Sequence, residues 1–190
     1  MRGLGILSNP LKCARFTGVS ARLTLIVITN NLKSMKSNFQ AEIRQNKPFS
    51  SLEEEAFLAL QRTADQLQGR ASEWLKGYGL SPTQYNALRI LRGAGDSGLA
   101  CSEIAERMIN RDPDITRLLD RLERRGLTRR SRDSKDRRII NAHITREGLQ
   151  LLKTLDEPVQ EFQHVLLGHM GERKLKTLIA ILCAARNAKV

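Results

Sequence analysis

The sequence predicts a mainly α-helical fold that carries one small β-hairpin. Apolar residues recur at helical spacing through most of the chain after residue 51, whereas residues 140–144 alternate between apolar and polar side chains, as a strand does. The composition is rich in Leu, Ala and charged residues and only 4% aromatic, so the core must consist mainly of aliphatic side chains on helices.

The first long helix is expected over residues 52–76. Ser51 and Glu54 form a capping-box pattern, in which a hydroxyl and a carboxylate bind the free amides of the first helical turn. Apolar residues then follow at helical spacing until Gly77 and Gly79 end the helix.

A second helix is expected to begin at Ser81 and Pro82, because serine is a favoured N-cap and proline a favoured first helical residue. Three glycines between residues 93 and 98 form a turn after it, and a short third helix is expected over 102–108.

A fourth helix, over 112–125, is expected to have one aliphatic face and one arginine-rich face. Asp112 and Pro113 repeat the start signal, and Gly126 ends the helix. Its apolar residues recur at i, i+3, i+4 and i+7, so they share one face. The apolar residues are Ile115, Leu118, Leu119 and Leu122; the opposite face carries Asp114, Arg117, Arg121 and Arg124, with Thr116 and Asp120 beside them.

A β-hairpin is expected directly after this helix. Residues 127–132 and 137–144 are the predicted strands, and the polar segment from Asp133 to Asp136 is the tip. A helix-turn-helix whose second helix is rich in arginine, followed by strand, charged tip and strand, is the order of a winged helix-turn-helix.

Two more helices are expected towards the C-terminus. The first begins at Thr145, and Pro158 is expected to kink or split it, because proline lacks an amide donor and clashes with the preceding turn. Gly168 and Gly171 then break the pattern, and residues 175–182 belong to a last amphipathic helix.

Positive charge is concentrated in two segments of a chain whose formal net charge is +12. Residues 1–48 hold eight basic residues and one acid, a balance of +7, and residues 111–138 hold eleven basic and six acidic residues, a balance of +5. The second segment therefore accounts for the whole excess outside the first 48 residues. A local basic band of this kind attracts polyanions such as nucleic acid.

Residues 1–48 are expected to be a basic, disordered extension, either native or lying upstream of a true start at Met35. An arm that holds DNA is the functional alternative. The apolar segment 23–28 is far too short to cross a bilayer, and the chain has no run of about 18 apolar residues. The sequence therefore predicts no membrane contact and a cytoplasmic location.

No catalytic, metal or cofactor site is expected, and the chain is not expected to be an enzyme. Cys13, Cys101 and Cys183 are far apart and form no CxxC or Cys/His cluster. No catalytic triad order, paired carboxylate cluster or phosphate loop emerges. Reduced thiols are the expected state; the alternatives are a thiol sensor and an enzyme that uses Cys101.

Five segments between residues 80 and 148 carry a resemblance to a known family. They are Leu-Ser-Pro-Thr-Gln-Tyr at 80–85, Ser-Glu-Ile-Ala-Glu-Arg at 102–107, Asp-Pro-Asp-Ile-Thr-Arg-Leu-Leu-Asp-Arg-Leu-Glu-Arg-Arg-Gly-Leu at 112–127, Asp-Arg-Arg at 136–138 and Ile-Thr-Arg-Glu-Gly at 144–148. In this order and spacing they resemble the MarR family of bacterial winged-helix transcription regulators.

The resemblance implies a symmetric homodimer. Within a MarR-like domain at 49–190, helices at 52–78 and 149–186 would pack against a second subunit, and residues 80–148 would bind DNA. Each subunit would place a helix in the major groove and a wing in the minor groove of a pseudo-palindromic, double-stranded operator. The implied function is a sequence-specific, ligand-responsive repressor; the alternative is a sequence-tolerant architectural DNA-binding protein.

The resemblance also implies which residues contact DNA. Thr116, Arg117 and Arg121 would face bases and nearby phosphates, and Arg138 would enter the minor groove with Asp136 orienting it. Arginine suits this role because its planar fork bonds O6 and N7 of guanine together or grips a phosphate. The full predicted DNA-binding set is Ser102, Asp114, Thr116, Arg117, Arg121, Arg124, Lys135, Asp136 and Arg138.

These assignments have alternatives. Arg117 and Arg121 would otherwise belong to a solvated helix face, paired with nearby carboxylates, and Arg138 would otherwise form a salt bridge with Asp136 or Asp133. The residues expected to give non-specific phosphate contacts are Arg129, Arg130, Arg132 and Lys135.

Ser102 would bind a phosphate from the preceding helix. Ala100 stands where the family has a capping hydroxyl, so Ser102 is expected to take over the cap.

The resemblance further implies a cleft between the dimer helices and the winged region that binds a small aromatic effector. Trp74, Tyr78 and Tyr85 are the candidate residues that line it. The alternative for Trp74, which lies in the apolar stripe of its helix, is a place in the core.

Overall fold

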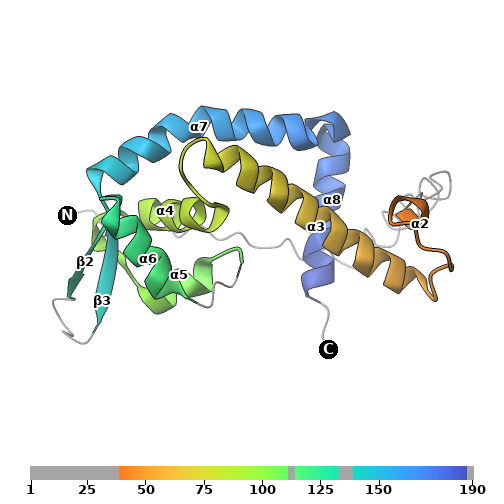
Figure 1. The fold of residues 1–190 in the computed structure, drawn as a ribbon, viewed down its shortest axis with the longest axis horizontal. Helices are drawn as coiled ribbons and strands as arrows, with labels where there is room; N and C mark the ends of the chain where they lie inside the picture. The colour runs from red at the N-terminus through yellow and green to blue at the C-terminus, as the bar shows by residue number, and fades with distance from the viewer. Residues whose placement is uncertain (1–38, 111–113, 133–138, 188–190) are drawn as a thin grey trace, which may run out of the picture. The chain divides into compact units, whose positions relative to one another are not determined.

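The computed structural model describes residues 39–110, 114–132 and 139–187 (Figure 1). The described helices are α2 (Phe39–Glu42), α3 (Leu52–Lys76), α4 (Pro82–Ala94), α5 (Cys101–Arg107), α6 (Ile115–Arg124), α7 (Arg146–Leu167) and α8 (Gly171–Arg186), with 3₁₀ turns η1 (Gly95–Ser97) and η2 (Gly168–Met170). The described strands are β1 (Leu99–Ala100), β2 (Thr128–Arg132) and β3 (Ile140–Ile144). The predicted fold class is confirmed.

These elements belong to two compact units. Phe57–His169 forms one unit, which contains most of α3, all of α4 to α7 and the sheet, and the described residues before and after it form the other. In the latter unit the rings of Phe39 and Phe49 stack 5.8 Å apart. Every predicted DNA-binding residue that the structure describes lies in Phe57–His169.

Side-chain caps begin α3 and α4, as the sequence predicts. The Ser51 hydroxyl accepts from the Glu54 amide at 3.2 Å. The Ser81 hydroxyl accepts from the Gln84 amide at 3.2 Å, and the Gln84 side chain accepts from the Ser81 amide at 3.0 Å. The Glu54 carboxylate instead binds the hydroxyl and the amide of Ser50, both at 2.6 Å, and these hydrogen bonds lower the pKa of Glu54.

Helix α6 begins two residues later than the predicted start at Asp112 and Pro113, which lie outside the described residues. Its N-cap is Asp114, whose carboxylate accepts from the Arg117 amide at 2.9 Å. This carboxylate satisfies an amide that has no partner within the helix, which is why aspartate is favoured at this position.

The aliphatic face of α6 is buried, as predicted. The exposed fractions are 7% for Ile115 and 4% for Leu118, and Leu119 and Leu122 are fully buried. They share one core with side chains from the neighbouring helices, which include Leu88, Leu91, Ile104, Leu152 and Leu155. Burying an aliphatic side chain of this size stabilises the fold by about 1.5–3 kcal/mol. The burial of this face therefore fixes which side of α6 meets solvent.

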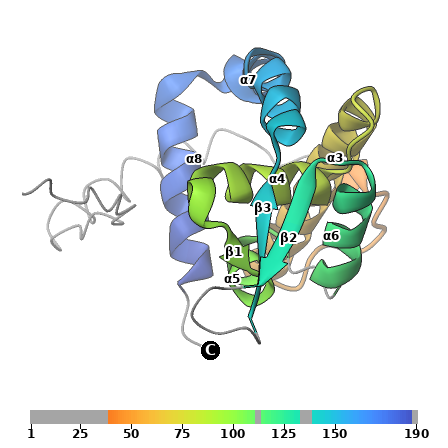
Figure 2. The ribbon, with the colours of Figure 1, turned by 90° about the vertical axis from the view of Figure 1, so that its left-hand side faces the viewer.

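The three strands form an antiparallel sheet with β3 in the centre (Figure 2). Ala142 of β3 lies opposite Arg130 of β2 and Leu99 of β1. The predicted hairpin strands are confirmed, whereas β1 was not predicted, because two residues are too few to show an alternating pattern. Gly98 precedes β1 with φ of +65°, and a Cβ there would lie 2.6 Å from the Ala142 carbonyl oxygen. Only glycine allows this close approach.

Helix α7 continues through Pro158 (Figure 1). Of the two outcomes expected at this proline, the split is therefore wrong, and the kink stays a prediction. Proline removes one backbone hydrogen bond, but Leu155 and Val159 on either side of it are both buried in the core. Packing of an apolar face supplies most of the stability of a helix in a folded protein, and here it outweighs the lost hydrogen bond.

Replacing Asp114 with Ala is expected to destabilise the fold by about 1 kcal/mol, because the Arg117 amide loses its acceptor. Asp114→Asn is the matched control, since its side-chain oxygen still accepts, and it should stay within about 0.5 kcal/mol of the original protein. Urea unfolding followed by circular dichroism measures both variants. Equal losses in the two variants would contradict the capping role.

Candidate nucleic-acid interface

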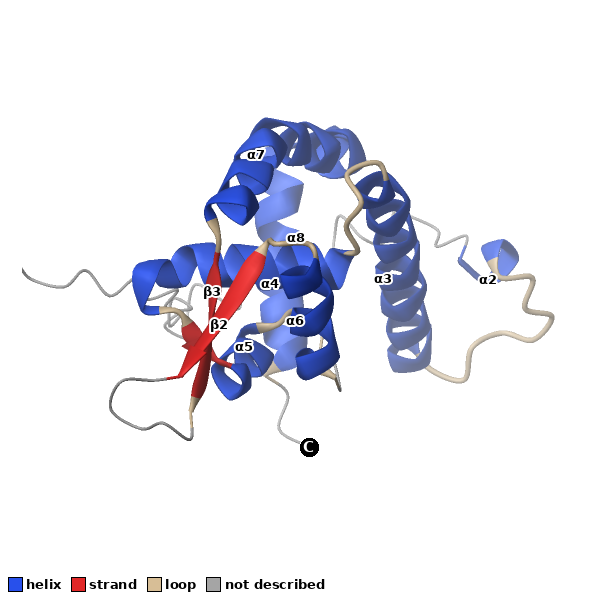
Figure 3. Cartoon of the chain, turned by 60° about the vertical axis from the view of Figure 1, so that its left-hand side comes forward, coloured by secondary structure: helices blue, strands red, loops and turns tan. Residues whose placement is uncertain are grey.

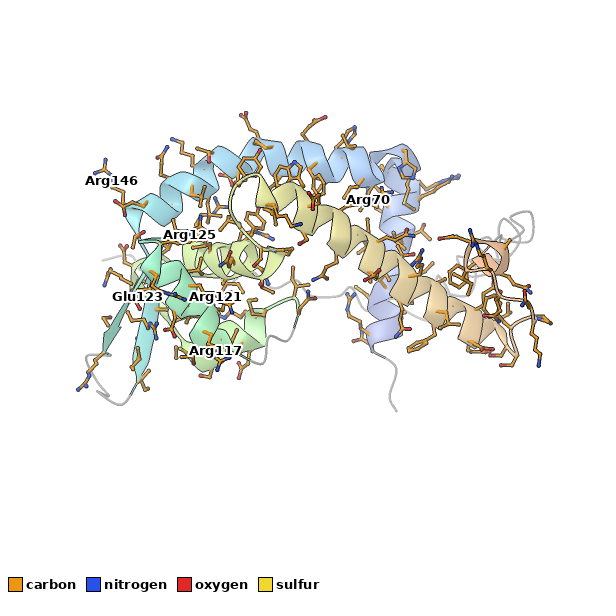
Figure 4. All side chains as sticks on the ribbon, in the orientation of Figure 1. Arg70, Arg117, Arg121, Glu123, Arg125 and Arg146 are labelled. Carbon is orange, nitrogen blue, oxygen red and sulfur yellow. The ribbon has the colours of Figure 1, made fainter. Side chains whose placement is uncertain are left out.

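The solvent side of α6 presents predicted DNA-binding side chains. Thr116, Arg117, Arg121 and Arg124 are all exposed, and the Arg117 side chain is 77% exposed. Figure 4 labels Arg117 and Arg121 on α6. The structure therefore brings these four residues together on one accessible helix face.

Arg117 also pairs with the N-cap residue. Its Nε lies 3.0 Å from an Asp114 carboxylate oxygen, which is the kind of pairing offered above as the alternative to DNA contact. Such an exposed i, i+3 pair stabilises a helix by only about 0.2–0.5 kcal/mol. A phosphate or a base could therefore displace it, and the pair does not withdraw Arg117 from solvent.

Arg125 binds an acceptor within the protein and is not counted with the arginines on the exposed face of α6. Its guanidinium donates to the Gly79 carbonyl in the turn between α3 and α4. Arg124, one residue earlier, lies back along its own helix, with its Nε 3.3 Å from the Asp120 carbonyl oxygen.

Arg130 of β2 is paired with carboxylates, which differs from the expected phosphate contact. Glu123 accepts from both the Arg130 amide at 3.1 Å and its Nε at 3.0 Å, and the guanidinium also pairs with Asp120. The hydrogen bond to Asp120 is the main cause that raises the pKa of Arg130. The strand β2 packs beside α6 at this point (Figure 3).

Ser102 lies exposed in the first turn of α5 and does not cap it. The N-cap is Ala100, whose amide donates to the Glu103 carboxylate at 3.1 Å. The expectation that Ser102 takes over the cap is therefore wrong, because α5 begins at Cys101 and Ser102 lies inside its first turn. The Ser102 hydroxyl remains at the surface.

The predicted tip of the wing lies outside the described residues. Lys135, Asp136 and Arg138, together with Asp133, belong to that segment. On the described part of β2, Arg129 and Arg132 are exposed.

The base of the wing is held by a buried histidine. His143 on β3 is 8% exposed, and its Nε2 lies 2.8 Å from the Ser131 hydroxyl oxygen. Its Nδ1 lies 3.2 Å from the Asp96 carbonyl oxygen, so both ring nitrogens have partners. This arrangement ties β3 to β2 and to the 3₁₀ turn η1.

A groove of about 270 Å³ lies between α3 and the helix-turn-helix. Its described lining is mostly apolar, with a few amide and hydroxyl groups: Ala64, Leu67, Gln68, Ala71, Pro82, Thr83, Asn86, Met108, Ile109 and Asn110. The resemblance implied a cleft between these elements, but no sequence pattern indicated these lining residues, because they come from three separate segments.

The aromatic residues predicted to line an effector cleft lie elsewhere. Trp74 stacks on Phe162 of α7, with ring centroids 4.8 Å apart, and Tyr78 packs against the same indole. Tyr85 is partly buried beside Arg89, and this burial raises the pKa of its phenol. None of the three predicted residues belongs to the lining of the groove, and their role in effector binding stays a prediction.

Across the described ranges, no group of three metal-ligating side chains comes together. Cys101 and Cys183 are partly buried free thiols, and Cys101 packs against the core. None of the helices in the described part of the chain has the length and apolar character needed to cross a bilayer.

Comparisons with known proteins agree with this geometry. Residues 80–140 match the family model described as the MarR family. The chain is 37% identical over 91 residues to the HTH-type transcriptional repressor MdtR of Bacillus subtilis, and the match covers 48% of this chain and 57% of MdtR. The chain thus matches little more than half the length of that relative.

Solved structures extend the match beyond the winged region. A MarR transcription factor from Planctomyces limnophilus is 42% identical, with a TM-score of 0.56, and the match covers 71% of this chain and 98% of that protein. The MepR–DNA complex of S. aureus has a TM-score of 0.61 at 23% identity, covers 67% of this chain and 93% of MepR, and supports the fold alone. This chain belongs to the MarR family of winged-helix transcription regulators.

Proposed function

We propose that this chain is a sequence-specific regulator, most simply a repressor, that places α6 in the major groove of an operator. The observation that carries the proposal is the division of α6 into a buried aliphatic face and an exposed face with three arginines. A helix whose aliphatic face is buried and whose exposed face is rich in arginine suits the major groove. There, a bidentate arginine–guanine contact gives about 1–3 kcal/mol of discrimination against the wrong base.

The proposed roles follow from position. Thr116, Arg117 and Arg121 would contact bases and nearby phosphates, and Arg124 and Ser102 would bind the backbone. The roles of Lys135, Asp136 and Arg138 in the wing rest on the resemblance alone. Asp114 is assigned to the interface only through its contacts with Arg117, because its carboxylate already caps α6.

The protein would act as a homodimer in the cytoplasm. Exposed apolar side chains on α3, α7 and α8 support helix-mediated pairing: Phe57, Leu60, Val165, Ile179 and Ile181. Two α6 helices related by a two-fold axis would contact half-sites about 34–36 Å apart, which is one turn of DNA. Occupancy of a promoter would then exclude polymerase, in keeping with MdtR being named a repressor.

Arg117→Ala is expected to lose about 1–3 kcal/mol of discrimination between operator and random duplex, because a base contact is removed. The operator would be a duplex that the original protein selects from a random pool. Arg70→Ala is the charge-matched control; Arg70 is exposed on α3, away from α6 (Figure 4), and its variant should discriminate as the original protein does.

Fluorescence anisotropy over a range of salt concentrations measures both variants. Unchanged discrimination in Arg117→Ala would contradict the base contact. If the original protein bound operator-length duplexes of every sequence alike, it would be an architectural DNA-binding protein rather than a specific regulator.

We also propose that the groove between α3 and the helix-turn-helix binds a small aromatic effector. It is concave and mainly apolar, and a compound bound there would contact both the proposed dimer helix and the turn before α6. Such a compound would change the spacing of the two α6 helices if it bound one arrangement of these elements better than the other.

Ala71→Trp is expected to abolish the response to an effector, because an indole at this position fills the groove. Benzoate and phenol are suitable probes; saturation at 100 times the dissociation constant would stabilise the original protein by about 2.7 kcal/mol. Thermal unfolding and release of DNA are the measurements. Equal responses of both proteins would contradict binding in the groove, and no response to either probe would contradict a small aromatic effector.

A further inference from the structure

Arg130 joins the proposed recognition helix to the wing through two carboxylates. Its amide donates to Glu123 at 3.1 Å, its Nε donates to Glu123 at 3.0 Å, and its Nη2 lies 2.9 Å from the same carboxylate. The guanidinium also pairs with Asp120, one turn earlier on α6. One strand residue thus binds two successive turns of the helix.

These contacts withdraw Arg130 from solvent. Its side chain is 23% exposed, compared with 77% for Arg117 on the open face of α6. A guanidinium presents its donors in a fixed planar fork, and here Nε and Nη2 are both engaged by carboxylates. The arginine is therefore not placed to grip a phosphate.

The carboxylates themselves need an explanation. Asp120 and Glu123 place negative charge on the helix that the proposed function turns towards DNA, where phosphates repel it. A surface selected for affinity alone would not carry them. Their hydrogen bonds to Arg130 instead hold β2 against α6, and β2 is paired residue by residue with β3, so both described strands of the hairpin are held together with α6.

We propose that Asp120, Glu123 and Arg130 form a positioning clamp that fixes the wing relative to α6 and thereby sets sequence discrimination. The effect on sequence discrimination rests on the proposed function, whereas the contacts of Arg130 with Asp120 and Glu123 do not. The clamp costs affinity for DNA in general, because it keeps two carboxylates near the phosphates, and it favours the duplex whose grooves fit both α6 and the wing at their fixed separation.

The test compares an Asp120→Ala/Glu123→Ala variant, Arg130→Gln and the triple variant. Alanine is the best helix former, so the double variant does not weaken α6 itself. The probes are a duplex selected from a random pool by the original protein and a scrambled duplex of equal length and composition. Arg129→Gln is the comparison variant, since Arg129 is the exposed neighbour of Arg130 on β2.

The clamp predicts that tighter binding of the scrambled duplex is accompanied by weaker discrimination between the two duplexes. The double variant should bind the scrambled duplex more tightly, yet discriminate between the duplexes about tenfold less, which is the size of one lost base contact. Arg130→Gln should also discriminate less. The triple variant should discriminate no less than the double variant, because the carboxylates that pair with Arg130 are already absent from the double variant.

A phosphate contact by Arg130 would overturn the proposal. Arg130→Gln would then lower the affinity for both duplexes equally, with or without the two carboxylates. It would also reduce the slope of log affinity against log salt concentration by about 0.9, as expected for Arg129→Gln. The double variant would then gain affinity for both duplexes with its discrimination intact.

A measurement without DNA separates this inference from the proposed function. Hydrogen exchange at the Arg130 amide should be about tenfold faster in the double variant, because Glu123 no longer accepts from it, while exchange at the Leu119 amide stays unchanged. Unchanged exchange at Arg130 would overturn the clamp. If the original protein selects no sequence from the pool, the proposed function fails, and the exchange result still decides whether the clamp exists.

Discussion

The burial of one face of α6 is the constraint on which the rest of the interface depends. Leu119 and Leu122 are fully buried, and Ile115 and Leu118 nearly so, which leaves the helix one way to lie on the core. Rotation about its axis would expose these aliphatic groups at a cost of about 1.5–3 kcal/mol each. The exposed arginines therefore owe their accessibility to the packing of their neighbours.

The arginines around α6 divide into two kinds by what they bind. Arg117 and Arg121 extend from the open face, whereas Arg125 and Arg130 bind acceptors within the protein, a carbonyl before α4 and two carboxylates of α6 itself. The second kind holds α6 to the elements on either side of it. Charge density alone therefore does not identify DNA contacts; the partners of each guanidinium do.

Signals local in the chain predicted most of the fold. The capping residues Ser51 and Ser81 and the apolar spacing of α6 depend on neighbours within one or two turns, and the structure confirms them. The continuity of α7 through Pro158, the two-residue strand β1, the lining of the groove and the partners of Arg130 depend on contacts between distant segments. A sequence pattern places Glu123 on α6 but does not place β2 beside it.

Methylation interference tests most directly whether α6 lies in the major groove. Guanine N7 faces the major groove, and its methylation blocks a bidentate arginine contact there. On a duplex selected from a random pool, we predict interference at guanines in two patches whose centres are about one helical turn apart. Interference confined to adenine N3 in the minor groove, or absent from both grooves, would contradict the account.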